Sequence, residues 1–596
     1  MTRERVVRGL GVLVVALIAM GALWSPAFLT GASGWGDWQW FHHMWEAGRV
    51  AYVRWGELPL WNPHHCGGVP LWGNPQAQVY SPTYLIFALP FGTNLGHKLF
   101  VLFHAVVGFA SMYTFARREV SLTRIASLLA AIAWCASGFF AWHGAGGHAT
   151  FLAFYYAPAL LLAWRAAERD LRWCGVVAAW MVLIVLEGGH YPFPYFVLLL
   201  AFDALVRAFA LPRLVPRLAA VAALSGALTG LLGAARFLPI LFALRANPHP
   251  VPDPDWLSPS EILEMLTART HDYRFAGHGW VWPEYGAYVG WAIVVLSALG
   301  LAAAFASITA SRTSARSRAT MLWLVLGLVL FFLFTQGSAT PHHPWPLLQE
   351  LPFYRSIHVP SRFRVLLIFF MALLAGVALD RIAQAIASLP VRADVRALSW
   401  AIPWTLVLAI TIDLYVINVG IIDRWNEEPV GVRAPVDHHL VRGRSYLDEY
   451  ANYPSENVGT IECYDPVPWP RSTRLWLGEG PQARIVPEEA GRVIAWGRTS
   501  LTVWADIELD EPALVVFNQN HADDWTSAQG QVISDDVRLA VDVQQPRGRM
   551  RVEARYFPRD LPYTVGLSLT GAIACVVLAL APWRRRRARQ AGAPTV

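Results

Sequence analysis

The sequence predicts a mainly α-helical protein that crosses a membrane many times and carries a small β-rich domain before its last helix. The chain of 596 residues is 55% hydrophobic and only 15% charged, whereas soluble domains usually carry about a quarter charged residues. Its apolar residues gather in long runs, and one segment near the C-terminus alternates apolar and polar residues instead. The net charge of +6 comes with arginines in short clusters between the apolar runs. That placement indicates membrane topology and argues against nucleic-acid binding.

Twelve apolar runs approach the length of a membrane-spanning helix, which is about 20 residues. They are expected at 8–26, 96–116, 124–142, 148–165, 173–187, 193–211, 217–241, 286–306, 319–335, 363–380, 399–420 and 562–582. The first run is long for a signal peptide, and no clear A-x-A cleavage site follows it. We therefore expect it to stay as an uncleaved first span.

Basic residues occur in every second connection between these runs, starting at the N-terminus. The clusters are Arg3/Arg5/Arg8, Arg117/Arg118/Arg124, Arg165/Arg169/Arg172, Arg207/Arg213/Arg217, Arg312/Arg316/Arg318, Arg381/Arg392/Arg396 and 584–587. The positive-inside rule places such clusters in the cytoplasm. The sequence thus predicts a multi-pass protein of the cytoplasmic membrane with both termini cytoplasmic and the chemically varied loops outside.

The chain is expected to divide into three parts. Residues 1–422 form a polytopic membrane domain whose first external loop covers about 27–95, and 562–596 form the last helix and a basic cytoplasmic tail. The part between them, 423–561, is too polar to span and too long to be a connector. It contains four strand-like stretches separated by Pro, Gly and Asp turns, at 501–509, 513–517, 537–543 and 550–557. This pattern predicts a β-sandwich-like domain outside the membrane.

One carboxylate, Asp37, lies at the outer end of the first span. Ionisable groups near membrane depth are functional candidates by default. An aspartate here could act as a general base on an acceptor hydroxyl or hold a metal. The alternatives are a cap for a helix that begins at Trp38 and a solvated charge at the membrane interface. The aromatic spacing over 38–52 is typical of an interfacial amphipathic helix.

A cationic group surrounds the outer mouth of the span at 363–380. It consists of Arg355, His358, Arg362 and Arg364. The positive-inside rule disfavours arginines on this side, and guanidinium groups match phosphate bidentately. We therefore expect a binding site for a lipid-linked phosphate. The alternative is pairing with a nearby carboxylate such as Glu350.

Several polar residues in the outer loops are candidates to line a substrate cavity. They are His64, His65, Gln76, Tyr80, Glu187 and His190. For the last two, the alternative is a tight helical hairpin turned by glycines and a proline. The outer histidines show no HExxH spacing, so we assign no metal site and expect no cofactor; a divalent metal is conceivable but unsupported.

Cys66 and Cys463 both lie outside the membrane and could pair, although geometry decides disulfides. The chain has no P-loop, no GxGxxG ahead of a helix and no G-x-S-x-G at a strand-to-helix turn. Nucleotide-driven transport and dinucleotide redox chemistry are therefore poor fits.

Short motifs run through most of the chain. They are Gly36-Asp37-Trp38, Gly56-x-Leu58-Pro59-Leu60-Trp61-Asn62-Pro63, Gly67-Gly68-Val69-Pro70, Asn74-Pro75-Gln76, Tyr80-Ser81-Pro82, Pro352-Phe353-Tyr354-Arg355 and Pro360-Ser361-Arg362-Phe363. With these motifs the chain resembles the YfhO family of bacterial membrane proteins, within the C-type (GT-C) glycosyltransferase superfamily.

The resemblance implies a catalytic aspartate in the first external loop, which here is Asp37. It also implies a polyprenyl-phosphate-linked sugar as donor and an envelope glycan, lipid or protein as acceptor, with transfer on the non-cytoplasmic face of a bacterial inner membrane. Asp37 would take the acceptor proton, and the cationic group would stabilise the departing lipid phosphate as the anomeric centre inverts. Some superfamily members have two adjacent acids at this point, whereas Trp38 follows Asp37 here, which argues against a metal-dependent variant.

Two other functions remain open from the sequence. The first is a non-enzymatic lipid-glycan transporter or envelope assembly factor, although no internal repeat of the transporter type is evident. The second is a metal-dependent hydrolase or phosphotransferase built from the outer histidines.

Overall fold

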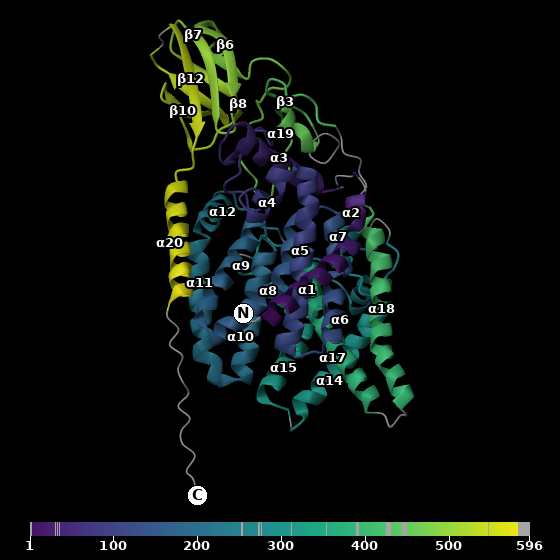
Figure 1. The fold of residues 1–596 in the computed structure, drawn as a ribbon. Helices are drawn as coiled ribbons and strands as arrows, with labels where there is room; N and C mark the ends of the chain where they lie inside the picture. The colour runs from purple at the N-terminus through teal and green to yellow at the C-terminus, as the bar shows by residue number, and fades with distance from the viewer. Residues whose placement is uncertain are drawn as a thin grey trace.

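The computed structural model is a helical bundle with a β-rich part at one end (Figure 1). It describes residues 3–29, 31, 34, 36–251, 254–271, 275, 277–311, 313–352, 354–388, 393–424, 431–443, 450–545 and 548–581. The predicted basic tail after residue 581 and Phe353 of the motif at 352–355 lie outside this range. The mainly α-helical membrane fold with a β-rich part before the last helix is confirmed.

Nine helical segments among the described residues are long and apolar enough to cross a membrane. They are α5 with the turn η1 (Thr93–Val120), α6 and α7 (Arg124–Ala145), α10 (Pro192–Ala210), η4 and α11 (Pro212–Leu232), α14 (Gly290–Thr309), α15 (Ala315–Thr335), η6 and α17 (Pro360–Ala387), part of α18 (Ala401–Ile422) and α20 (Leu561–Leu580). Each coincides with a predicted span. The protein is therefore a multi-pass membrane protein.

The other three predicted spans fall on shorter or interrupted helices. They are α1 (Arg3–Leu23), α9 (Cys174–Leu186), and the pair η2 (Ala149–Tyr156) and α8 (Ala157–Arg169). The predicted span at 217–241 is also divided, because α11 (Val215–Leu232) ends at Gly233 and α12 (Ala234–Ala246) follows. The short helices outside these spans are α2 (Ser25–Leu29), α3 (Trp38–Arg54), α4 (Pro82–Phe91), α13 (Pro259–Thr267), α16 (Pro344–Gln349) and α19 (Tyr453–Glu456).

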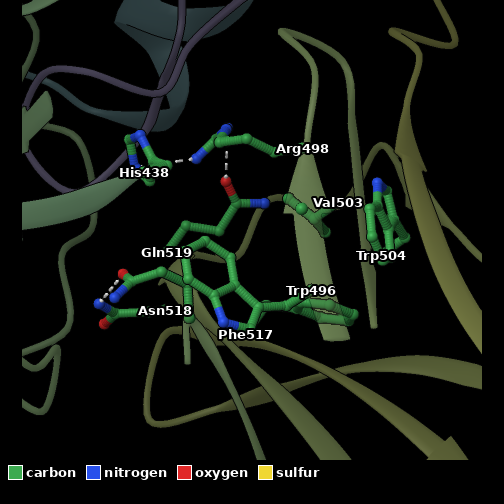
Figure 2. A pocket seen from close by; sticks show the side chains of 10 residues that line it. His438, Trp496, Arg498, Val503, Trp504, Phe517, Asn518 and Gln519 are labelled. Carbon is green, nitrogen blue, oxygen red and sulfur yellow. Dashed lines mark hydrogen bonds between the residues drawn. The ribbon is translucent and has the colours of Figure 1, made fainter. Parts of the chain in front are cut away.

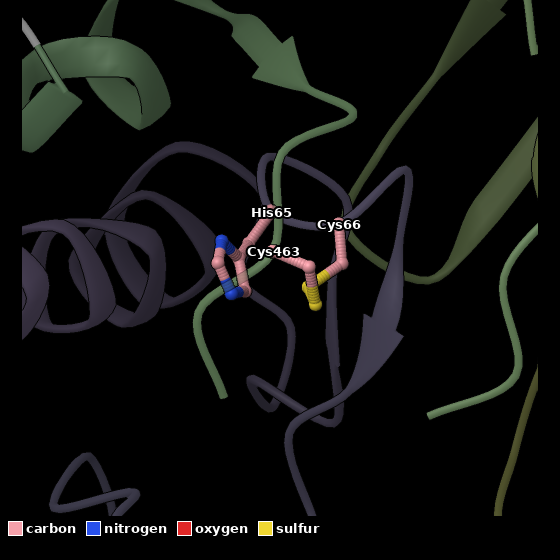
Figure 3. A group of neighbouring side chains, drawn as sticks. All are labelled: His65, Cys66 and Cys463. Carbon is pink, nitrogen blue, oxygen red and sulfur yellow. A yellow bond between two sulfur atoms is a disulfide. The ribbon is translucent and has the colours of Figure 1, made fainter. Parts of the chain in front are cut away.

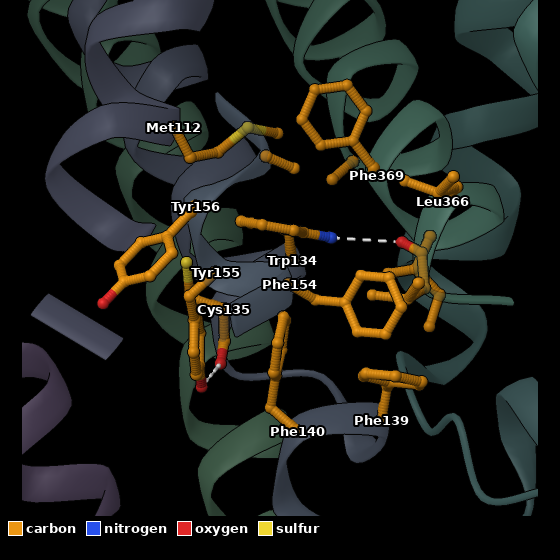
Figure 4. Close-up of a cluster of buried hydrophobic side chains, with 14 of the residues drawn as sticks. Met112, Trp134, Cys135, Phe139, Phe140, Phe154, Tyr155, Tyr156, Leu366 and Phe369 are labelled. Atoms are coloured by element: carbon orange, nitrogen blue, oxygen red, sulfur yellow. Dashed lines mark hydrogen bonds between the residues drawn. The ribbon is translucent and has the colours of Figure 1, made fainter. Parts of the chain in front are cut away.

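An aromatic core joins the central helices of the bundle (Figure 4). The segment of α6 and α7 and that of α17 are each 89% buried, against 11% for α20, so α20 is peripheral. Trp134 donates its indole N–H to the Val365 carbonyl, 3.2 Å away, and Phe140 stacks on Tyr155 with ring centroids 3.7 Å apart. Stacked and edge-to-face rings of this kind fix the relative position of the helices that carry them. The loop at 144–148 follows α7, and the loop at 282–290 packs on α7 where Gly286 lies against Trp142.

The β-rich part consists mainly of two four-stranded sheets, in the orders β10-β11-β8-β5 and β6-β7-β12-β9. Their strands are β5 (Ala483–Val486), β6 (Gly491–Arg498), β7 (Thr502–Leu509), β8 (Ala513–Asn520), β9 (Trp525–Thr526), β10 (Gln531–Asp535), β11 (Arg538–Val543) and β12 (Gly548–Tyr556). Alternate residues of β7 (Val503, Ala505, Ile507) share one hydrophobic cluster with Val515 and Phe517 of β8. The two sheets thus enclose a sandwich core, and all four predicted strands are present.

A disulfide ties the first external loop to the β-rich part (Figure 3). Cys66 and Cys463 are bonded, with their Cα atoms 4.5 Å apart, so the predicted pairing is confirmed. The Asn520 side chain of β8 donates to the Cys66 carbonyl at 2.6 Å. This docking also corrects the expectation for α3, which is not an interfacial helix. Its residues from Trp38 to Gly48 are all buried, because η7 (Tyr450–Asn452) and α19 pack on it.

Candidate functional site

Asp37 lies directly before α3, in a turn that packs on the loop at 144–148. Its backbone N–H donates to the Gly146 carbonyl at 3.1 Å. Gly147 has a φ of +85°, and a Cβ there would overlap the backbone nitrogen of Trp38. Only glycine permits so close an approach of two backbones. The contact places His148 beside Asp37.

The Asp37 side chain is not used as a helix cap. It occupies the N-cap position of α3 but makes no capping hydrogen bond. Its Oδ2 lies 3.6 Å from His148 Nε2, and the side chain is 26% exposed. Burial raises the pKa of Asp37 above that of an ordinary aspartate, and the nearby charge of Glu284 acts in the same direction, while His148 and Arg362 oppose it. A partly accessible carboxylate with a raised pKa suits a general base.

The neighbouring acid, Glu284, forms a buried ion pair with Arg362. Glu284 ends the turn η5 (Trp282–Glu284), and Arg362 lies in the turn η6 (Pro360–Phe363). Arg362 donates Nε to Oε2 at 2.8 Å and Nη2 to Oε1 at 2.5 Å, and both side chains are only 7% exposed. Burial opposes ionisation of Glu284, but the charge of Arg362 outweighs it and lowers the pKa to about 2.

Arg362 keeps one donor free in this arrangement. Its guanidinium lies over the rings of Phe151 and Tyr191, at 4.8 and 4.4 Å from the ring centroids. Its Nη1 is buried without a hydrogen-bond partner among the described residues. A buried guanidinium nitrogen without a partner is costly. It is therefore a candidate to bind an anionic oxygen of a substrate.

A chain of hydrogen bonds leads from Arg364 through His143 to His148, which lies beside Asp37. Arg364 donates Nη2 to His143 Nε2 at 3.0 Å, and His143 Nδ1 lies 2.5 Å from His148 Nδ1. Since an arginine only donates, His143 carries its proton on Nδ1 and gives it to His148 Nδ1. The proton of neutral His148 then lies on Nε2 and faces the carboxylates of Asp37 and Glu284, 3.6 and 3.9 Å away. These six residues, Asp37, His143, His148, Glu284, Arg362 and Arg364, are called the outer cluster below.

Only part of the predicted cationic group lies together in the structure. Arg362 and Arg364 belong to the outer cluster, and His358 reaches it through Tyr191, whose hydroxyl lies 2.8 Å from His358 Nδ1. Burial, reinforced by Arg362, lowers the pKa of His358 to about 3, so this histidine is neutral at pH 7. Arg355 is exposed, and the structure does not bring its side chain into the cluster. Pairing with a carboxylate does occur, but the partner of Arg362 is Glu284 rather than Glu350.

The residues predicted to line a substrate cavity lie in separate places. His64 and His65 are buried against the β-rich part, where His64 Nδ1 contacts the Val458 carbonyl (2.9 Å) and His65 Nδ1 contacts the Tyr450 hydroxyl (2.6 Å). Tyr80 donates to the Pro59 carbonyl at 2.7 Å. All three therefore have structural contacts that hold the first external loop.

The other three cavity candidates lie where the first external loop meets the turn after α9. Glu187 is fully buried and accepts hydrogen bonds from Ser81 and Thr83. Gln76 accepts from the Trp40 indole at 3.2 Å, and its carbonyl packs on Gly188. His190 bonds to the Gly188 carbonyl and lies against Tyr191. Of the six candidates, His190 therefore adjoins the outer cluster through Tyr191.

The sequence analysis did not select Glu284, His143 or His148 as site residues. Glu284 shares one signal with Asp37, because each is an acid at the outer end of a predicted span. His143 and His148 flank a glycine-rich turn at the outer end of the span at 124–142. None of the three stands in a recognisable motif, since their partners come from other loops.

Two groups of side chains have the composition of a metal site. His65, Cys66 and Cys463 form the first (Figure 3), but both sulfurs are already bonded to each other. His143, His148 and Glu284 form the second, with one donor atom of each within 4.8 Å of the others. Imidazole and carboxylate donors suit a divalent transition metal. His143, His148 and Glu284 are thus the residues of the outer cluster that could hold a divalent cation.

The β-sandwich contains a small polar pocket (Figure 2). His438, Arg498, Trp496, Trp504 and Gln519 are among its lining residues, and its volume is about 20 Å³. Such a volume holds about one water molecule. The pocket is therefore too small for a sugar.

No protein-family model matches the chain, and no curated protein matches its sequence. Several solved structures are similar to it, among them the following three. The archaeal oligosaccharyltransferase AglB from Archaeoglobus fulgidus, in complex with an inhibitory peptide and a dolichol-phosphate, is 12% identical over 78% of this chain and 65% of AglB, with a TM-score of 0.46. Arabinofuranosyltransferase AftD from Mycobacteria is 14% identical over 70% of this chain and 27% of AftD, with a TM-score of 0.40. ArnT from Cupriavidus metallidurans in the apo state is 14% identical over 78% of this chain and 86% of ArnT, with a TM-score of 0.39.

This chain thus spans 65% of the length of AglB. The identities are 12–14% and the TM-scores are below 0.5. These similarities therefore support no conclusion about activity.

Proposed function

We propose that the protein is an inverting glycosyltransferase of the cytoplasmic membrane of a bacterium. It transfers a sugar from a polyprenyl-phosphate-linked donor to an envelope glycan, lipid or protein on the non-cytoplasmic face. One observation carries the proposal: the outer cluster combines a partly accessible carboxylate, Asp37, with a buried arginine, Arg362, that has an unused donor. The motifs shared with the YfhO family support the same assignment.

The reaction needs a base and an anion-binding group, and the cluster offers both. Asp37 takes the proton of the acceptor hydroxyl as its oxygen attacks the anomeric carbon C1. The bond from C1 to the phosphate oxygen breaks, and its electron pair leaves with the lipid phosphate. Arg362 Nη1 donates to that phosphate, a role that preorganised cations perform well. A single displacement inverts the anomeric centre.

The remaining cluster residues hold these two groups in place. His148 directs its Nε2 proton toward Asp37, and Arg364 and His143 fix the tautomer that makes this possible. Glu284 holds the guanidinium plane of Arg362. Arg355 is accessible and is assigned to the outer part of the phosphate path, while neutral His358 contributes a hydrogen bond rather than a charge.

The position of the cluster suits a donor that stays in the bilayer. Arg362 and Arg364 lie at the start of a membrane-spanning segment, Pro360–Ala387. The phosphate of a polyprenyl lipid lies at this depth, where its chain remains among the apolar helices. The helix α3, which Asp37 directly precedes, and the β-rich part lie at the same end of the bundle (Figure 1), from which a polar acceptor would approach.

The test is release of polyprenyl phosphate by the purified protein in lipid vesicles. A panel of polyprenyl-monophosphate sugars is supplied with an envelope extract as acceptor. We expect one donor to be consumed by the native protein and not by the Asp37→Asn variant, with both proteins folded by circular dichroism. Glu46→Gln, which removes the next acid along α3, serves as the matched control and retains activity. Full activity of Asp37→Asn would refute the assignment.

The same vesicles separate the alternatives. A lipid-glycan transporter would move a labelled sugar-lipid across the bilayer equally well with Asp37→Asn, but not with Arg362→Gln. A divalent-cation requirement would appear as loss of transfer in a chelator and recovery with one added metal. Since His143 and His148 would then supply ligands, His148→Ala would abolish metal binding measured directly on the protein.

A further inference from the structure

A second polar site lies at the end of the bundle opposite the β-rich part (Figure 1). The ends of α5, α8, α10 and α15 enclose a cavity of about 250 Å³ there. Five arginines line it: Arg118, Arg165, Arg169, Arg207 and Arg316. All five belong to basic clusters that the sequence places in the cytoplasm. This site is called the inner cavity below.

Three of these arginines are paired with carboxylates. Arg165 donates Nε to Asp203 at 3.1 Å, and Arg169 lies 2.7 Å from Glu119. Arg207 bonds to Glu168. Arg165, Arg207, Glu168 and Glu119 have side chains at most 8% exposed. These buried ion pairs form one wall of the cavity.

The other two arginines have no such partner. Among the described residues, neither Arg118 nor Arg316 forms an ion pair with a carboxylate, and both are exposed at the cavity. Five arginines therefore stand against three carboxylates, Glu119 and Glu168 of the lining and Asp203 behind Arg165, so two arginines are in excess. Its wall also includes the first turn of α15, where Ser314 is the N-cap. The N-terminus of a 21-residue helix adds partial positive charge.

We propose that the inner cavity binds a phosphate group from the cytoplasmic side. Its volume of about 250 Å³ far exceeds the roughly 10–15 Å³ that one water needs in a cavity, and leaves room for a phosphate with part of its ester. The positive-inside rule accounts for arginines at these helix ends, but it does not require an enclosed cavity with unpaired charge. Arg118 and Arg316 line the same cavity as the three paired arginines, and several guanidinium groups around one space suit an anion with several oxygens. This site is independent of the proposed transferase activity.

Two kinds of molecule carry such a phosphate group. One is the headgroup of an anionic phospholipid, because basic pockets between membrane helices bind such headgroups. The other is a soluble phosphate or phosphate ester. The exposed apolar residues Leu205 and Phe209 on the same end of α10 place the cavity beside the lipid phase.

The experiment compares two double variants of the full-length protein. Arg118→Gln with Arg316→Gln removes the two unpaired cavity arginines. Arg213→Gln with Arg318→Gln removes the same charge from exposed positions that do not line the cavity. Arg318 lies on the same helical turn as Arg316, so this control is closely matched.

Lipid binding is measured by native mass spectrometry after reconstitution with phosphatidylcholine plus cardiolipin. Soluble binding is measured as the rise in unfolding temperature with inorganic phosphate against chloride at equal ionic strength. We expect the native protein and the control to retain cardiolipin or respond to phosphate. The cavity variant should bind at least about tenfold more weakly.

If the cavity variant loses only cardiolipin binding, the ligand is a lipid headgroup. If it loses only the response to phosphate, the ligand is a soluble phosphate. Equal binding by the cavity variant and the control would overturn the proposal. Binding of neither probe by the native protein would also overturn it.

Discussion

The outer cluster and the inner cavity are built from the same parts but leave opposite charges unpaired. Each joins arginines to carboxylates between helix ends. In the outer cluster, Arg362 is paired with Glu284, whereas among the described residues no arginine or lysine lies within ion-pair distance of Asp37, and His148 is 3.6 Å away. In the inner cavity, every carboxylate is paired, and two arginines are left over.

The difference shows that ion pairs between arginines and carboxylates at helix ends can support different unpaired groups at the two ends of the bundle. A buried ion pair costs desolvation and seldom adds net stability over apolar packing. What it does is fix the position of the neighbouring unpaired group. At the end of the bundle that carries the β-rich part this group is a carboxylate, which can accept a proton, and at the opposite end it is a pair of arginines, which can bind an anion.

The largest effect is expected on catalysis. Asp37→Asn should lower transfer by about 10²–10⁴-fold, which is the usual contribution of a general base. The rate of polyprenyl phosphate release in vesicles measures it. Asp37→Glu should recover part of the loss, because a carboxylate returns in a slightly displaced position. A loss of less than tenfold in Asp37→Asn would mean that Asp37 is not the base.

The second effect concerns the outer ion pair. Glu284→Gln leaves the charge of Arg362 buried without its partner, so the free energy of unfolding should fall by about 3–5 kcal/mol. The double variant Glu284→Gln with Arg362→Met should regain part of this stability but no activity. Denaturant unfolding in detergent measures both. If the single and double variants are equally stable, leaving Arg362 without Glu284 costs nothing, and the two residues do not form a buried ion pair.

The third effect concerns how the stability of the folded protein depends on pH. Asp37 and Glu284 should contribute to this dependence with opposite signs. The pKa of Asp37 is raised above 3.8, so the folded state binds its proton more tightly and stability falls as pH rises through the raised value. The pKa of Glu284 is lowered from 4.5 to about 2, so its stabilising contribution is complete above 4.5 and is lost as pH falls toward 2.

Unfolding temperatures at several pH values test this. Asp37→Asn should be more stable than the native protein at pH 7, and the gain should shrink as pH falls. Glu284→Gln should be less stable at pH 7, and the loss should shrink below pH 4.5. Parallel curves for the two variants would show that the environments of these carboxylates do not differ as described.

The smallest effect is expected for the unpaired arginines of the inner cavity. Arg316→Gln removes an exposed charge without a carboxylate partner, so the free energy of unfolding should change by less than about 0.5 kcal/mol. Arg165→Gln should cost several times more, because the fully buried Asp203 then keeps only the Trp164 indole at 3.0 Å and Arg207 at 3.9 Å. Denaturant unfolding of the two variants checks the ratio. If both variants lose the same free energy of unfolding, the paired arginines and the unpaired arginines of the cavity do not differ as described.

Local patterns in the sequence predicted most of the fold. Nine of the predicted spans and four strands lie where the hydrophobic periodicity placed them, because burial in lipid or in a sandwich core selects residues at fixed spacing. The exceptions have local causes. Gly233 divides one span, and α3 is covered by the β-rich part rather than by lipid headgroups.

The sequence also determined which ionisable groups lie at helix ends, and Asp37, Arg362 and Arg364 were found in this way. Only the tertiary structure decided their partners. Arg362 pairs with Glu284, 78 residues away in the chain, and His148 reaches Asp37 because two glycine turns pack together. Such pairings depend on which helices become neighbours and on rotations about their axes. Periodicity along one segment contains no information about either, so the charge balance at each end of the bundle could be read only from the folded protein.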